Sequence, residues 1–372
     1  DANTIARQVE QTLRTAGSEV IPSTVLAHHV ALALEAGYGH DRRAMFEATL
    51  GRPAELEVIE YDGSSMPFSR GVVSRSMMAI GLGPEMSYRL ASTLENRLWR
   101  QGDPQVHRGR MRELVTDILR EEAGEQFARR YELLHSFKKS GQPTIVMVGG
   151  APGVGKSTIA AELAYRLGIG RLVSTDSVRE ALRSLISREL SPVLHSSTFT
   201  AWKAELLPEE SNRSEPKSRM VIRGFMSQVR MLSNAVGGII NRTLDEASSL
   251  VLEGVHLVPG VPMGADSTPQ EGAQVVMLML AVPDEQSHRD HFAIRERQTA
   301  SKRMQDYYTQ HFREVRLLQD YLIGQARHEG VPVIDATDAD DAVEAGLHHV
   351  LTTMFATRLS HSQEEETASS QG

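Results

Sequence analysis

Apolar residues in the first third of the chain recur at three- and four-residue spacing, which is typical of amphipathic helices. Ile5, Val9 and Leu13 form one such row. Beyond residue 143 the pattern changes to short, continuous apolar runs, each followed by helical spacing. The five runs read TIVMVG, RLVST, SLVLEG, VVMLMLAV and VPVIDAT. Buried strands that alternate with helices indicate an α/β fold, so we predict a parallel five-stranded sheet flanked by helices, preceded by a mainly helical N-terminal region.

Changes in polarity divide the chain into segments. The polar sequence KKSGQP at 138–143 predicts a linker between the helical region and the α/β domain, which we place at 144–358. The last stretch, 359–372, is polar and lacks periodicity, and we predict that it is disordered. The helical region itself divides into residues 1–52 and 53–137, because it contains an internal repeat.

The repeat becomes visible when residues 5–50 are moved forward by 85 positions onto residues 90–135. The shift needs no gap. Identical residues then coincide: Ala6 with Ala91, Glu10 with Glu95, Leu13 with Leu98, Gly17 with Gly102, Val30 with Val115, Leu34 with Leu119, Gly39 with Gly124 and Glu47 with Glu132. Two amphipathic helices can match by chance, but a matched glycine between matched helices favours a duplication.

The second copy is preceded by VIEYDGSSMPFSRGVVSRSM, which predicts a strand, an Asp-Gly turn, a return segment and a helix capped by Ser69. This region, residues 56–137, resembles the ATP-cone, a regulatory nucleotide-binding module. Glu60 and Tyr61 stand where that family usually has a basic pair, so a structural or dimerising role is the alternative, with a homo-oligomer formed through the N-terminal helices. The first copy lacks the strand and opening helix. Because the chain also starts at Asp1 rather than methionine, we expect it to be part of a longer polypeptide.

Composition excludes several classes of function. The formal net charge is −8, whereas nucleic-acid binders usually have a basic excess, so we expect no nucleic-acid partner. The chain has no cysteine, which rules out disulfides and thiolate metal sites and fits a cytoplasmic location. No apolar run approaches the ~20 residues that a membrane-spanning helix needs, so we expect no membrane partner.

The strongest motif joins the first buried strand to an amphipathic helix and has the pattern G-x(4)-G-K-S of a phosphate-binding P-loop. Its glycines let backbone N–H groups point at phosphates, Lys156 supplies positive charge, and the Ser157 hydroxyl is a ligand for Mg²⁺. We therefore predict an ATP site. Its residues are Gly150, Ala151, Pro152, Gly153, Val154, Gly155, Lys156, Ser157 and Thr158.

Asp176 ends the second strand run, and Arg179 follows one helical turn later. In a P-loop kinase this carboxylate would lie near the γ-phosphate, where it could accept the proton of a substrate hydroxyl or hold the Mg²⁺ hydration shell. Arg179 would clamp an anionic substrate. The alternative is an ordinary Asp–Arg pair at a helix start.

Glu253 ends the third strand run in SLVLEGVH, where P-loop kinases often have an acidic residue that faces the metal. We predict that Ser157, Asp176 and Glu253 surround Mg²⁺. His256 is a candidate substrate contact, although a hydrogen-bonded loop histidine is the alternative.

The segment HRDHFAIRERQTASKR is rich in arginine and predicts a lid that closes over ATP. Guanidinium groups there would stabilise charge on the transferring phosphoryl group. We expect Arg295 and Arg303 to act in this way, while other arginines of the segment are merely solvated.

The order of GGAPGVGKST, STDSVREALRSLIS, LHSSTFTAW, EGVHLVPG and the arginine-rich segment resembles the 2-phosphoglycerate kinase family. That resemblance covers residues 56–357. It implies a P-loop kinase behind an ATP-cone-like module, with a small anionic substrate: ATP and 2-phosphoglycerate would give ADP and 2,3-bisphosphoglycerate. Alternatives are a kinase for another phosphorylated hydroxy acid, a nucleotide-sensing regulatory protein and a polynucleotide kinase, which the negative charge disfavours.

Overall fold

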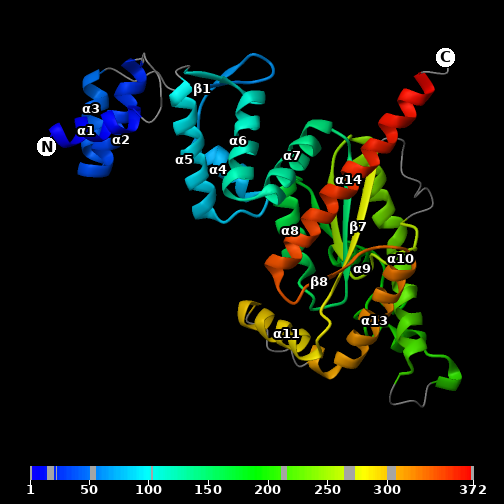
Figure 1. Ribbon diagram of the computed structural model, residues 1–372. Helices are drawn as coiled ribbons and strands as arrows, with labels where there is room; N and C mark the ends of the chain where they lie inside the picture. The colour runs from blue at the N-terminus through cyan, green and yellow to red at the C-terminus, as the bar shows by residue number, and fades with distance from the viewer. Residues whose placement is uncertain are drawn as a thin grey trace. The chain divides into compact units, whose positions relative to one another are not determined.

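The computed structural model describes residues 2–14, 21, 23–50, 56–101, 104–210, 216–263, 273–299 and 307–369. The chain forms two compact units, Asp1–Glu132 and Leu133–Gly372, which we call the N-terminal and C-terminal units (Figure 1). None of the described helices is long and apolar enough to cross a membrane.

The N-terminal unit begins with three helices, α1 (Ala2–Arg14), α2 (Ser23–Tyr38) and α3 (His40–Leu50). Val9 and Leu13 of α1 pack against Val25 and Ala33 of α2 in a small apolar core. The three-and-four spacing of these residues is what lets two helices bury one face each.

A small sheet and four more helices follow. Strands β1 (Glu57–Ile59) and β2 (Ser65–Pro67) are antiparallel, and β3 (Gln105–His107) pairs with β1 in parallel. The helices are α4 (Arg70–Met78), α5 (Pro84–Gln101), α6 (Arg108–Glu122) and α7 (Glu125–Ser140). As expected, Ser69 caps α4, and its hydroxyl accepts the N–H of Val72. The strand β3 was not predicted, because three residues are too short for a periodic signal.

Helix boundaries in the two halves of this unit coincide at the 85-residue shift. Helix α2 begins at Ser23 and α6 at Arg108, while α3 begins at His40 and α7 at Glu125. The glycines between these helices share a left-handed conformation, with φ of 86° at Gly39 and 106° at Gly124. A residue with a Cβ would be strained there, which explains the matched glycines. We take this agreement as support for the proposal of a duplication.

The C-terminal unit contains the predicted five-stranded sheet. Its order is β5-β6-β4-β7-β8, and every neighbouring pair is parallel. The strands are β4 (Thr144–Gly150), β5 (Leu172–Ser174), β6 (Leu250–Gly254), β7 (Gln274–Ala281) and β8 (Val333–Asp335). All seven residues of β4 are buried, as expected for the central strand of a sheet covered on both faces. The fold prediction is confirmed.

Helices cover both faces of the sheet. Helix α8 (Lys156–Leu167) and α14 (Ala339–Ser369) pack together on one face, and α10 (Ser218–Asp245) with α13 (Phe312–His328) on the other (Figure 1). Helix α9 (Thr175–Leu185) follows β5 and contacts α10, and α11 (Glu285–Thr299) follows β7. Two short 3₁₀ helices, Ala201–Glu205 and Pro208–Glu210, precede α10.

Two predicted irregular segments are partly helical. Helix α7 continues to Ser140, so only residues 141–143 of the predicted linker are non-helical, and the boundary between the units lies within α7. Helix α14 continues to Ser369, through most of the predicted disordered tail. Extending an existing helix adds one hydrogen bond per residue without a new nucleation cost, which polarity alone does not reveal.

Candidate active site

The P-loop lies at the carboxyl end of the central strand, between Gly150 of β4 and Lys156, the first residue of α8. At Gly153, φ is 85°, and a Cβ there would overlap the ring of Phe292 in α11. Both observations require glycine at this position. The loop therefore has the short, tightly turned backbone that presents N–H groups and a helix N-terminus to phosphate.

The structure brings Ser157 and Glu253 together. Because β6 lies beside β4, Val148 pairs with Glu253 in the sheet, and the Ser157 Oγ donates a hydrogen bond to Glu253 Oε1 at 3.0 Å. Glu253 is only 7% exposed. A hydroxyl and a carboxylate at a helix start form an oxygen donor set that fits Mg²⁺, which keeps several waters and needs few protein ligands. The described residues contain no group of three or more His, Cys, Asp or Glu side chains that could hold a metal ion.

Lys156 lies over the loop itself. Its Nζ donates to the carbonyl of Ala151 at 2.8 Å, so the ammonium group is held inside the curve of the P-loop. A single cation at this place faces the same space as the loop N–H groups, which is the position expected for a charge that contacts β- and γ-phosphates.

Asp176 and Arg179 lie in the first turn of α9, directly after β5. Ser174 is the N-cap of this helix, and its hydroxyl accepts the N–H groups of Asp176 and Ser177 at 3.1 and 3.2 Å. Since Ser174 satisfies the helix end, Asp176 is not needed as a cap. Its side chain is 61% exposed and lies 3.4 Å from Arg179 Nη2.

The Arg179 side chain is mostly buried and only partly satisfied. Its Nη1 donates to the Ser196 carbonyl at 3.2 Å, whereas its Nε is buried without a hydrogen-bond partner among the described residues. A buried guanidinium N–H without an acceptor is costly. An anionic ligand at this place would supply the missing acceptor.

His256 requires a correction. It is 2% exposed, and both ring nitrogens have partners: Thr175 Oγ1 lies 3.0 Å from Nδ1 and Gln228 Oε1 lies 3.0 Å from Nε2. A buried ring with both nitrogens engaged cannot contact substrate, so the predicted substrate contact is wrong and the alternative of a hydrogen-bonded loop histidine holds. Burial depends on α10 packing over the loop, which the local pattern did not show.

The predicted lid is only partly described. Arg295 lies within α11, but its side chain is outside the described residues, as is the whole of Arg303. Earlier residues of α11 contact the P-loop in a way that the sequence did not suggest to us. His288 Nε2 donates to the Pro152 carbonyl at 2.9 Å, and His291 Nδ1 lies 3.2 Å from the Gly153 carbonyl. The three-and-four spacing of His288, His291 and Phe292 was the available signal, because it places all three on one helix face.

No family model matches the chain. The 2-phosphoglycerate kinase of Methanopyrus kandleri is 37% identical over 290 residues, which cover 78% of this chain and 85% of that protein. The enzyme of the same name from Pyrococcus horikoshii is 36% identical over 297 residues, covering 80% of this chain and 94% of the relative. The chain belongs to the 2-phosphoglycerate kinase family. The C-terminal unit is thus a phosphotransferase, as its P-loop predicts.

Solved structures add little. A putative kinase from Chloroflexus aurantiacus matches 57% of this chain and 97% of its own length with a TM-score of 0.30 and 15% identity. A gluconokinase from Sinorhizobium meliloti matches with a TM-score of 0.28. Likeness at this level carries no argument, so the fold assignment rests on the strand order of the chain itself.

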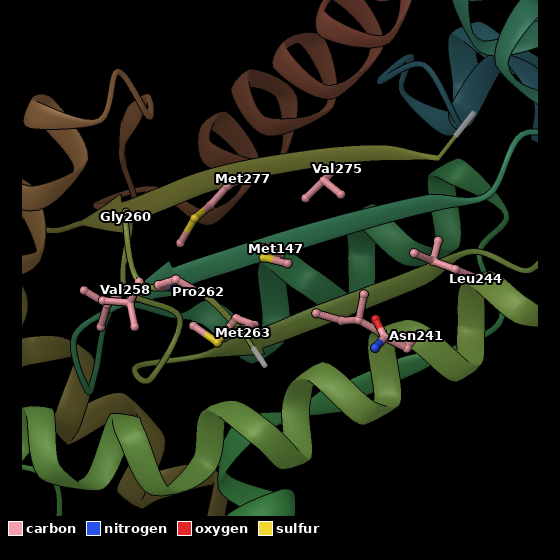
Figure 2. A pocket seen from close by; sticks show the side chains of 11 residues that line it. Met147, Asn241, Leu244, Val258, Gly260, Pro262, Met263, Val275 and Met277 are labelled. Atoms are coloured by element: carbon pink, nitrogen blue, oxygen red, sulfur yellow. The ribbon is translucent and has the colours of Figure 1, made fainter. Parts of the chain in front are cut away.

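A cavity of about 340 Å³ lies between the sheet and α10, and none of the kinase-site residues named above is among its lining residues (Figure 2). Met147 of β4, Met277 of β7 and Met263 line it, and Asn241 contributes its one side-chain amide. Among the described residues that line it, none carries a charge. These residues would strip the hydration from a phosphorylated acid without supplying a compensating cation, so the described lining does not favour such an acceptor.

Buried histidines of the kinase unit predict sensitivity to acid. Burial lowers the pKa of His256 to about 3 and the pKa of His288 to about 4. An unfolded histidine has a pKa of about 6.5, so below that pH the unfolded chain binds more protons than the folded chain. The free energy of unfolding is therefore highest above about pH 6.5 and decreases as the pH is lowered toward the pKa values of the folded protein. Each histidine should remove up to about 1.4 kcal/mol of unfolding free energy per pH unit. Urea unfolding across this range measures the slope. His256→Gln should flatten it, and an unchanged slope would contradict the assignment.

Proposed function

We propose that the protein transfers the γ-phosphoryl group of ATP to the free hydroxyl of 2-phosphoglycerate, giving ADP and 2,3-bisphosphoglycerate. The observation that carries this proposal is the gathering of Lys156, the Ser157–Glu253 pair and the Asp176–Arg179 pair at the carboxyl edge of adjacent strands. Two relatives that cover most of this chain are named for the same activity. Ligands of open parallel sheets bind at this edge.

Each group has a role that follows from its chemistry. The P-loop N–H groups and Lys156 bind the phosphates of ATP, and Ser157 with Glu253 would hold Mg²⁺. The metal, when bound, neutralises charge that develops on the β- and γ-phosphates. As the acceptor oxygen bonds to phosphorus and the bond to the β–γ bridging oxygen breaks, Asp176 takes the hydroxyl proton, because its exposed carboxylate can reach the acceptor.

Arg179 is proposed to bind the acceptor's own anionic group. Arg179→Lys keeps the positive charge but loses the planar fork, so KM for 2-phosphoglycerate should rise about tenfold or more while KM for ATP changes little. Steady-state kinetics with each substrate varied in turn measures this. The exposed Arg242 of α10 supplies a matched control, and Arg242→Lys should leave both constants unchanged. A defect of Arg179→Lys toward ATP alone would contradict the role.

The acceptor can be tested directly against the alternatives. ADP release should be fastest with 2-phosphoglycerate in a panel that also contains 3-phosphoglycerate, glycerate, other phosphorylated hydroxy acids and an oligonucleotide. Faster turnover with another phosphorylated acid would replace the acceptor but keep the chemistry. ATP binding without turnover on any member of the panel would favour the nucleotide-sensing regulatory protein.

The remaining roles are proposals that rest on the sequence. Arg295 and Arg303 would close over ATP from the lid.

In the cone-like region Glu60 accepts a hydrogen bond from Arg108 Nε at 3.0 Å. This ion pair engages the Arg108 cation and leaves the pair close to neutral, which supports a structural role for the region over nucleotide binding. The segment boundaries, the homo-oligomer and the cytoplasmic location stay predictions.

A further inference from the structure

A continuous chain of buried hydrogen bonds connects four elements of the kinase unit. It runs from Thr175, at the start of α9, to His256, just after β6, and then to Gln228 in the middle of α10. From there Gln228 Nε2 donates to the carbonyls of Val193 and Ser196 at 2.9 and 3.0 Å. Thr175 and Gln228 have no exposed surface. Thr175, His256 and Gln228 therefore make these hydrogen bonds out of contact with bulk water.

In this series of hydrogen bonds, the carbonyls of Val193 and Ser196 determine which atom donates at each step. Two backbone carbonyls face the Gln228 amide, and carbonyls only accept, so the NH₂ group must point at them. Gln228 Oε1 then faces His256, which must donate from Nε2. The neutral ring consequently accepts at Nδ1, and Thr175 must donate its hydroxyl proton there. Reversal of one bond would bring two acceptors or two donors together.

Both ends of the chain touch residues of the proposed acceptor site. Thr175 directly precedes Asp176, and it packs so closely on β6 that a Cβ at Gly254 would overlap its hydroxyl. The Ser196 carbonyl that Gln228 holds also accepts from Arg179 Nη1. Glu253 lies at the end of the strand that leads to His256. The hydrogen-bonded network thus shares the Ser196 carbonyl with Arg179 and includes Thr175, the residue before Asp176, while His256 follows the strand that carries Glu253.

We propose that Gln228 is a positioning residue of the acceptor site, which holds Asp176 and Arg179 in register with Glu253 by fixing His256 in its neutral, Nε2-protonated form. The proposal rests on the proposed function, because it deepens the role of the same site. Side chains of this kind act through geometry, and a misplacement of about 1 Å can cost roughly 100-fold in rate.

The proposal also requires that the His256 ring is neutral. The charged groups that act on the ring are Asp176 and Arg179 of α9 and Lys156 of α8, while the facing side chain of α10 is the uncharged Gln228. Asp176 favours the imidazolium, and the two cations oppose it. A carboxylate in place of the Gln228 amide would add a second negative charge in direct contact with the ring.

The variant Gln228→Glu keeps the shape of the side chain but removes both N–H donors and adds this charge. We expect kcat/KM for 2-phosphoglycerate to fall roughly 100-fold, with KM for ATP nearly unchanged. A new ionisation should also appear in the pH profile of kcat/KM for the acceptor. Gln228→Met, which carries no charge, should show the acceptor defect without the new ionisation. A merely structural role would reduce the fraction of active enzyme, so it would lower kcat and leave both KM values and the pH profile unchanged, which would overturn the proposal.

Gln274 provides the matched control. It is a buried glutamine at the opposite, amino end of β7, and its amide donates to the Met354 carbonyl at 3.4 Å. Gln274→Glu should lower thermal stability while both KM values and the pH profile stay as in the parent protein. If it reproduced the acceptor defect, the effect of Gln228→Glu would be general destabilisation and the proposal would be wrong.

A second measurement is independent of turnover. In protein labelled with ¹⁵N-histidine, His256 should show the Nε2-protonated neutral tautomer throughout the range from about pH 5 to about pH 8. The opposite tautomer, or titration within this range, would overturn the proposal even if the enzyme were fully active. Failure of the proposed function is recognised separately, as absence of turnover with 2-phosphoglycerate, and the kinetic comparison is then made with the acid that the panel identifies.

Discussion

Replacement of Lys156 by alanine should reduce kcat by at least about 10²–10³-fold, because it removes the only side-chain cation that the structure places inside the described P-loop. The transferring phosphoryl group carries negative charge that the loop N–H groups alone do not balance. ATP should also bind more weakly, since Lys156 contacts the phosphates in the ground state as well. Coupled ADP-release kinetics at saturating ATP measures the effect on kcat.

Lys217, an exposed residue at the start of α10, gives the corresponding control. Lys217→Ala should retain full activity, and the thermal unfolding midpoints of both variants should stay close to that of the parent protein. Near-normal turnover of Lys156→Ala would mean that phosphoryl transfer takes place somewhere other than this loop.

Asp176→Asn should lower kcat by roughly two to four powers of ten, because the amide keeps the shape of the carboxylate but cannot accept the acceptor's proton. Folding should hardly change, since Ser174 rather than Asp176 caps α9. Loss of one negative charge in the first turn costs about 0.3–1 kcal/mol of stability. Single-turnover measurements with ATP and 2-phosphoglycerate separate this chemical step from product release.

Asp41, in the first turn of α3, provides the comparison. Asp41→Asn removes the same kind of charge from the same kind of helix position, so the two variants should lose similar stability. Only Asp176→Asn should lose activity. Normal turnover of Asp176→Asn would show that another group takes the proton.

The features that could be predicted from the sequence are those encoded within a short stretch. The five strands were predictable because each is a continuous apolar run, and the P-loop because strand, glycines and helix are adjacent. The pairing of Ser157 with Glu253 follows once their strands are neighbours. Asp176 and Arg179 were predicted from their spacing to share one helix face, and they form the ion pair that the alternative interpretation expects, while their roles toward substrate stay predictions.

Features that depend on packing between distant segments were missed or misjudged. His256 was considered for substrate contact, yet α10 buries it, and Gln228 gave no signal because a lone glutamine in a helix has no pattern. His288 and His291 contact the P-loop across more than a hundred residues, and their helix carries no local pattern that names its partner. Such contacts are set by the order of strands, which local periodicity does not contain.

The central position of β4 has a consequence for the order in which the chain can fold during synthesis. Thr144 bonds Ser249, 105 residues further on, and β7 on the other side of β4 is synthesised later still. The strand β4, which leads into the P-loop, is therefore synthesised before either of its neighbouring strands. Its backbone hydrogen bonds with β6 and β7 form only after those strands have been made. The N-terminal helices, whose contacts are closer in sequence, can fold in that interval. We therefore expect the nucleotide site to form late, and ATP binding by a nascent chain to require that β7 has been synthesised.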